Sequence, residues 1–232
     1  MRFFVILLGM GQAVALLLIL LYCAIMVPTF QMGFYQRQFE RNRVEQVIGI
    51  ERDELIRVTT HLMAYMRGRE DDLQITAVVQ GTERPFFSQR EIDHMVDVRD
   101  LFAGGALIFQ GAVIVFVVTG AFFMLIAKSS LTTLARIHRN TNIAVLTFLA
   151  LLTVVIALDF TRAFDIFHEI FFNNDYWILN PQVDLLINMV PEPFFVNIGI
   201  YVAVLFVVLS VAVIVLAGLY LRRARRMRRW FT

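Results

Sequence analysis

The chain has 232 residues, of which 59% are apolar and 17% charged, with a net charge of +2 at neutral pH. Water-soluble domains carry about 25% charged residues, so this composition excludes an ordinary soluble domain and indicates an integral membrane protein. The single cysteine, Cys23, excludes an internal disulfide and a zinc site built from cysteines.

Four apolar segments predict transmembrane helices at residues 1–27, 101–127, 142–158 and 196–221, since a helix needs about 20 apolar residues to cross the hydrocarbon core. The first segment could instead be a cleaved signal peptide. Its apolar run is longer than an h-region of about 7–15 residues and no small-x-small site follows, so we expect a retained anchor. No span carries an ionisable side chain in its middle, which disfavours a transporter or channel.

Lys and Arg are unevenly distributed over the connecting segments. The link 128–141 and the tail 222–232 carry bases and no acid, whereas residues 28–100 carry 10 bases and 13 acids, and residues 159–195 one base and six acids. We therefore expect both termini and the link to be cytoplasmic and the two acidic segments to be extracytoplasmic. The arginine tail could suggest nucleic-acid binding, but directly after a span it is explained by orientation and attraction to anionic lipid.

The first outer segment, residues 28–100, has the patterns of a small folded domain. Residues 39–49 and 52–67 have helical patterns, and Gly68 is expected to end the second helix. Residues 73–80 alternate like a strand, GTERP predicts a turn, and residues 86–88 could pair back as a second strand. The predicted fold class is mainly α, a polytopic membrane protein with four transmembrane helices and a small extracytoplasmic α+β domain.

Ser88 and Glu91 form a capping-box pattern that predicts a helix running into the second span. On it, Glu91, His94 and Asp97 follow each other at intervals of three and share one broad face. A histidine between two carboxylates can be held in one tautomer with its imidazolium stabilised, which suggests a catalytic site. The charged face of an interfacial helix would have the same pattern, so the triplet alone leaves both interpretations open.

The second outer segment, residues 159–195, contains another histidine among aromatic and acidic residues. Asp165 and His168 share a helix face, and Glu169 follows directly. The alternative is an aromatic belt with an isolated histidine. Of the other histidines, we interpret His138 as a solvated base of the inner link, and His61 lies in the middle of a predicted helix.

The residue types available outside the membrane limit the chemistry. A zinc site from His94, His168, Glu91 and Asp97 is chemically allowed, but there is no HExxH motif and we expect no metal. Ser88 is the only serine in the outer segments, and no cysteine or GxSxG motif is present there, so an acyl-enzyme is poorly supported. General acid–base catalysis with a nucleophile supplied by the substrate remains.

Three blocks, IGIERDELIRVTTHLMAYMRG, FSQREIDHMVDVRDLF and ALDFTRAFDIFHEIFFNNDYWILNPQVDLLINMVPEPFF, resemble the lipoprotein intramolecular transacylase family of small four-span bacterial membrane proteins. The resemblance extends over the whole chain. It implies a multi-pass enzyme of the bacterial cytoplasmic membrane, with its active site on the extracytoplasmic face. Such an enzyme moves the sn-2 acyl chain of a lipoprotein's diacylglyceryl-cysteine to its own α-amino group, giving lyso-form lipoprotein. The resemblance also implies that His94 and His168 are the catalytic residues.

We expect the binding partners of the protein to be a diacylated lipoprotein N-terminus and membrane lipid. Around the two histidines we expect two further groups of residues. No cofactor and no nucleic acid are expected. The supporting carboxylates would be Glu91, Asp97, Asp165 and Glu169, and the substrate-binding candidates are Arg162, Tyr65 and Trp177. A non-catalytic membrane scaffold or accessory protein that binds lipoproteins or lipids is the alternative.

Overall fold

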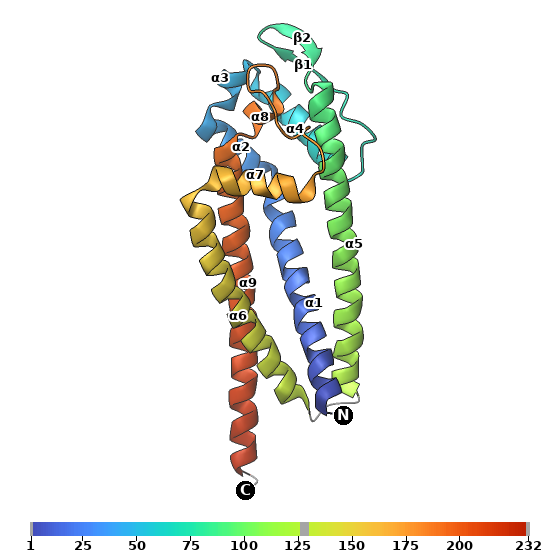
Figure 1. The fold of residues 1–232 in the computed structure, drawn as a ribbon, viewed down its shortest axis with the longest axis vertical. Helices are drawn as coiled ribbons and strands as arrows, with labels where there is room; N and C mark the ends of the chain where they lie inside the picture. The colour runs from blue at the N-terminus through green and yellow to red at the C-terminus, as the bar shows by residue number, and fades with distance from the viewer. Residues whose placement is uncertain (1, 126–129, 231–232) are drawn as a thin grey trace. The chain divides into compact units, whose positions relative to one another are not determined.

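The computed structural model describes residues 2–125 and 130–230, which form a mainly helical protein with one short β-hairpin (Figure 1). The predicted end of the second span at residue 127, Lys128 of the link and the last two residues of the tail lie outside the described residues.

Four helices are long and apolar enough to cross a membrane: α1 (Arg2–Thr29), α5 (Gln89–Leu125), α6 (Leu131–Leu158) and α9 (Glu192–Trp230). Each contains most or all of one predicted span and continues beyond it, because the polar residues at the ends of the spans also favour helix. The mainly helical fold class with four apolar helices is confirmed.

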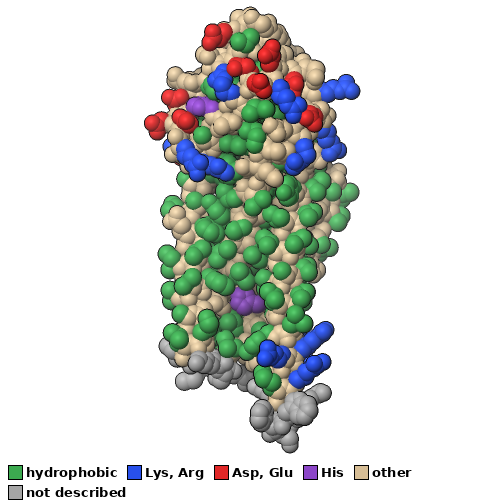
Figure 2. Space-filling model, turned by 180° about the vertical axis from the view of Figure 1, so that it is seen from behind, with side chains coloured by type: hydrophobic (Ala, Val, Ile, Leu, Met, Phe, Trp, Pro, Cys, Tyr) green, Lys and Arg blue, Asp and Glu red, His purple; other side chains and the backbone are tan. Residues whose placement is uncertain are grey.

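One compact unit, unit 1, consists of Met1–Ile25, Ala106–Leu158 and Val202–Thr232. Tyr22 of α1 stacks on Phe109 of α5 with ring centroids 4.5 Å apart. Most apolar side chains of these helices point outward and are exposed, as expected for a surface that faces lipid. Figure 2 shows this apolar surface.

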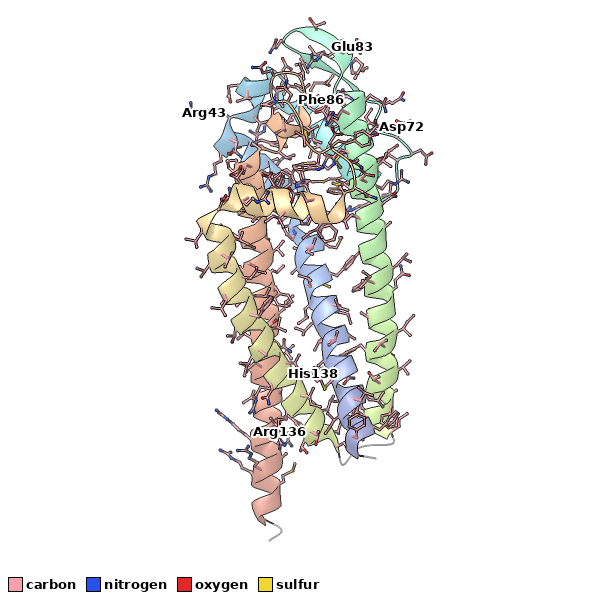
Figure 3. The ribbon with its side chains drawn as sticks, in the orientation of Figure 1. Arg43, Asp72, Glu83, Phe86, Arg136 and His138 are labelled. Atoms are coloured by element: carbon pink, nitrogen blue, oxygen red, sulfur yellow. The ribbon has the colours of Figure 1, made fainter. Side chains whose placement is uncertain are left out.

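The interior of unit 1 contains a polar group that the sequence did not predict. Gln12 of α1 is buried, and its side-chain amide donates to the carbonyl of Phe116 on α5 at 3.3 Å. His138 lies on α6, with Nε2 3.3 Å from Oε1 of Gln12 (Figure 3). The expectation of a solvated His138 in the inner link is wrong, because α6 already begins at Leu131 and places this side chain beside Gln12.

The second compact unit, unit 2, consists of Met26–Gly105 and Asp159–Tyr201. Its apolar core includes Phe34, Leu55 and Phe86, the last of which is 1% exposed (Figure 3). Its remaining elements are α2 (Met32–Asn42), α3 (Val44–Ile48), α4 (Arg52–Met66), β1 (Thr76–Val79), β2 (Thr82–Pro85), α7 (Phe160–Phe171) and α8 (Leu186–Met189).

Two elements of unit 2 differ from the sequence-based expectation. The helix expected at residues 39–49 is divided at Arg43, which adopts the left-handed conformation with φ 54°. The second strand is β2 rather than residues 86–88. Gln80 and Gly81 both have positive φ, so two residues suffice for the hairpin turn and the antiparallel pairing starts at Val79 and Thr82.

Two predicted helix ends are confirmed. Ser88 and Glu91 form a capping box at the start of α5: the Ser88 N–H donates to Oε2 of Glu91 at 2.6 Å, and the Glu91 N–H donates to Oγ of Ser88 at 3.3 Å. Gly68, with φ 67°, follows α4. The N–H of Arg69 donates a hydrogen bond to the carbonyl of Ala64 and so caps the end of the helix.

Candidate active site

Two histidines from distant parts of the sequence meet in unit 2. The ring centroids of His94, on the first turns of α5, and His168, on the last turn of α7, lie 5.9 Å apart. Both side chains are almost completely buried, at 8% and 6% exposed. A positive charge on one imidazole therefore disfavours a positive charge on the other, so the pair can hold at most one extra proton easily.

The hydrogen bond of His168 determines its tautomer. Its Nδ1 lies 2.7 Å from the carbonyl oxygen of Phe164, one turn earlier in α7. A carbonyl only accepts, so Nδ1 carries the proton and Nε2 keeps the lone pair that can act as a base. Trp177 stacks on this imidazole, with centroids 4.7 Å apart and planes at 23°, and fixes the plane of the ring.

Burial also affects the charge of His168. It lowers the pKa of the imidazole, although the hydrogen bond to Phe164 and the nearby charge of Asp165 act in the opposite direction. His168 is therefore neutral at pH 7 and available to accept a proton.

His94 has an unused hydrogen-bonding atom. Its Nδ1 is buried and has no hydrogen-bond partner among residues 2–125 and 130–230. An unsatisfied buried polar atom costs about 1–3 kcal/mol, which a bound substrate group can recover. Phe172 packs against both imidazoles, with ring centroids 5.3 Å from His94 and 5.6 Å from His168, and covers them with apolar surface.

Glu91 does not orient His94, contrary to the sequence-based expectation. It is 1% exposed, and its two carboxylate oxygens accept hydrogen bonds from the backbone N–H groups of Leu186 and Ser88. Asp184 supports the same junction, since it accepts from the Ser88 hydroxyl at 2.9 Å and from the backbone N–H of Asn180 at 2.8 Å. Glu91 thus attaches the second outer segment to the start of α5.

Asp97 holds the segment that carries Trp177. Its Oδ2 accepts a hydrogen bond from the side-chain amide of Asn174 at 2.8 Å, and the carbonyl of Asn174 accepts one from the indole N–H of Trp177 at 3.1 Å. The chain Asp97–Asn174–Trp177 leads to the ring stacked on His168. Asp97 therefore also supports the ring stacked on His168, through Asn174, a residue that was not predicted from the sequence.

The model of the family described as "Lipoprotein intramolecular transacylase Lit" matches residues 10–195. The chain belongs to the Lit family. It is therefore a lipoprotein intramolecular transacylase and not the non-catalytic scaffold considered from the sequence. His94 and His168 both lie in the part of the chain that matches the family.

Solved structures show the same fold. The membrane integral lipoprotein intramolecular transacylase Lit from Bacillus cereus is 20% identical, with a TM-score of 0.82 over 98% of this chain and 100% of that chain. Structures of that Bacillus cereus enzyme with a histidine mutated to arginine or to alanine match with TM-scores of 0.75, over 96% and 95% of this chain and 93% and 94% of those chains. No curated protein sequence matches the chain. The Lit fold and the four apolar helices make this a multi-pass membrane protein.

The remaining predicted site residues have other partners in this Lit-family protein. Arg162 and Glu169 form an exposed ion pair at 3.4 Å along α7. Asp165 influences His168 through its charge alone among the contacts described. Tyr65 belongs to the core, 3% exposed, with the Arg99 guanidinium 4.9 Å above its ring.

Arg90 and Asn174 were not predicted from the sequence. Arg90 donates to the backbone carbonyls of Ile178 and Asp175 and pairs with the Asp175 carboxylate at 3.4 Å. The only sequence signal for Asn174 is the turn-forming NND, in which its side chain accepts from the N–H of Tyr176. No cluster of three potential metal ligands occurs among the residues that the structure describes.

Proposed function

We propose that this Lit-family enzyme moves the sn-2 acyl chain of a lipoprotein's diacylglyceryl-cysteine to the α-amino group of the same cysteine, with His94 and His168 as the catalytic residues. The observation that supports this most strongly is the buried pair of imidazoles, one with a fixed tautomer and one with a nitrogen free for a ligand. The site would act on the extracytoplasmic face, as the distribution of Lys and Arg predicts.

The proton has to move from the attacking nitrogen to the departing oxygen. In the proposed step the free amine attacks the ester carbonyl, an N–C bond forms, and Nε2 of His168 accepts the proton that the amine loses. The C–O bond to the glyceryl oxygen then breaks, and the His168 imidazolium returns its proton to that oxygen. The protons balance, and no acyl-enzyme is formed.

The hydrogen bonds around the two histidines support His168 as the base in this proposal. Glu91 and Asp97 form their hydrogen bonds elsewhere, while Phe164 fixes the tautomer of His168. In our proposal His94 hydrogen-bonds the reacting ester through its unpartnered Nδ1 and so orients it.

The substrate supplies much of the remaining rate enhancement. Its amine and ester belong to one molecule, so the reaction is intramolecular and needs mainly correct placement of the two groups. Exposed apolar side chains of α7, such as Phe167, Ile170 and Phe171, would accept the acyl chains of the lipoprotein.

The four histidines of the chain allow a matched test. His94→Asn and His168→Asn should each abolish transfer to a purified diacylated lipoprotein, measured as the mass and acyl positions of its N-terminal peptide. His61→Asn removes a histidine that contacts the Asp72 carbonyl, and His138→Asn removes the one beside Gln12. Both controls should retain turnover. Full activity of His94→Asn or His168→Asn would refute the assignment.

A further inference from the structure

The charges of the chain are divided sharply between the two compact units. All 19 Asp and Glu residues belong to unit 2, and the sequence of unit 1 contains none. Unit 1 contains 10 of the 21 Lys and Arg residues, of which six lie in the tail after residue 221. Figure 2 shows Lys and Arg side chains gathered at one end of this unit. The Lys and Arg residues of unit 1 therefore have no Asp or Glu partner within their own unit.

Three of these arginines line a pocket of about 460 Å³ between α6 and α9. Arg139 comes from α6, and Arg222 and Arg225 come from α9. Arg139 is half-buried, and its guanidinium donates to the neutral side-chain oxygen of Asn140 at 3.1 and 3.2 Å. Its positive charge is therefore not compensated by this contact.

The rest of the pocket wall is apolar. Val215, Gly218 and Leu219 form part of it, one turn and more before the arginines on α9. A Cβ added at Gly218 would have no atom within 4 Å, so the space beside this glycine is empty and can hold a larger group. The pocket thus has arginines at one end and an apolar wall beside them. The wall belongs to α9, a helix long and apolar enough to cross a membrane.

We propose that this pocket binds an anionic phospholipid, with its phosphate between Arg139, Arg222 and Arg225 and the start of an acyl chain along the wall at Gly218. Guanidinium groups bind phosphate oxygens through charge-assisted, often bidentate hydrogen bonds. Arginines beside a span also attract anionic lipid. The apolar wall belongs to a helix whose surface faces lipid, so a phospholipid can place its acyl chain along the wall while its phosphate reaches the arginines, which a free phosphate cannot do.

The site lies wholly within unit 1 and uses neither catalytic histidine. The distribution of Lys and Arg predicts that it faces the cytoplasmic leaflet, where a specific lipid would fix the ends of α6 and α9 to the bilayer. Its test does not depend on the proposed acyl transfer, because the measured quantity is lipid affinity.

Native mass spectrometry of the full chain in detergent can measure this affinity. The probes are phosphatidylglycerol, the zwitterionic lipid phosphatidylcholine, and glycerol 3-phosphate as the headgroup without acyl chains. We expect phosphatidylglycerol to bind more tightly than the other two. The triple variant Arg139→Gln/Arg222→Gln/Arg225→Gln should lose about tenfold or more in affinity for it, since each arginine near an anionic lipid contributes about 1 kcal/mol.

The same helices supply a matched control. Arg136→Gln/Arg223→Gln/Arg226→Gln removes the same charge from α6 and α9 but leaves the three arginines of the pocket, and should lose much less affinity (Arg136 is labelled in Figure 3). Gly218→Leu keeps every arginine and fills the apolar wall, and should also weaken lipid binding.

Equal losses in the two triple variants would show diffuse attraction by the tail and overturn the site. No preference of the unmutated chain for phosphatidylglycerol would overturn it as well, and so would unchanged affinity in the Gly218→Leu variant. Circular dichroism and a monodisperse gel-filtration profile identify variants that have folded before affinities are compared.

Discussion

Glu91 provides a direct test of how the site is held together. The sequence suggested that this carboxylate orients His94, whereas the structure shows it accepting the backbone N–H groups of Ser88 and Leu186. Glu91→Gln keeps the size of the side chain but replaces one acceptor oxygen by an NH₂ group. One of the two backbone donors then faces another donor and loses its partner.

The expected cost follows from these contacts. A hydrogen bond to a charged group contributes about 1.5–3 kcal/mol, and the bond that remains is weakened because its acceptor is now neutral. We therefore expect Glu91→Gln to reduce the free energy of unfolding by about 2–4 kcal/mol. For a chain of this size that corresponds to a decrease in Tm of about 5–15 °C.

Thermal unfolding in detergent measures the stability, and a lipoprotein assay well below the Tm measures the turnover. Asp93→Asn is the matched control, because Asp93 lies half a turn away on α5 and bonds only the exposed side chain of Gln89 among the contacts described. It should change stability by less than about 0.5 kcal/mol. Glu91→Gln should retain most of its turnover at low temperature.

The opposite pattern would refute this interpretation. If Glu91→Gln unfolds at the same temperature as Asp93→Asn but loses its turnover, Glu91 acts on the chemistry and not on the attachment of the second outer segment.

The remaining predictions concern the histidine pair. The His168 imidazole should stay neutral to below its ordinary pKa of about 6.5, because burial lowers its pKa; an NMR titration of this ring measures it, and protonation at or above pH 6.5 would contradict the expectation. Asn174→Asp places two carboxylates together and should reduce kcat, and the double variant Asp97→Asn/Asn174→Asp should restore part of the loss, measured as a double-mutant cycle. Trp177→Ala should reduce turnover more than Trp177→Phe, which keeps an aromatic ring on His168; equal losses would exclude the stack as the cause.

The hairpin and the histidine at residue 138 show where sequence patterns were insufficient. The alternation at residues 73–80 indicated a strand, but the two-residue turn depends on positive φ at Gln80. Glutamine rarely adopts this conformation, so the sequence does not indicate it. His138 was expected to be a solvated base of the inner link, although helix α6 had already begun at Leu131. Helical patterns and caps are local and were read correctly at Ser88 and Gly68.

The sequence by itself determined the membrane class, the four apolar helices and the two histidines worth testing. Apolar runs, the distribution of charge and the resemblance to the family are all visible along the chain. Only the tertiary structure decided that His94 and His168 are neighbours, and that Glu91 and Asp97 bind the second outer segment instead of His94. Helical spacing places side chains on one face, but Leu186 and Asn174, which attach Glu91 and Asp97 to the second outer segment, lie more than 70 positions away, and no local pattern can specify them.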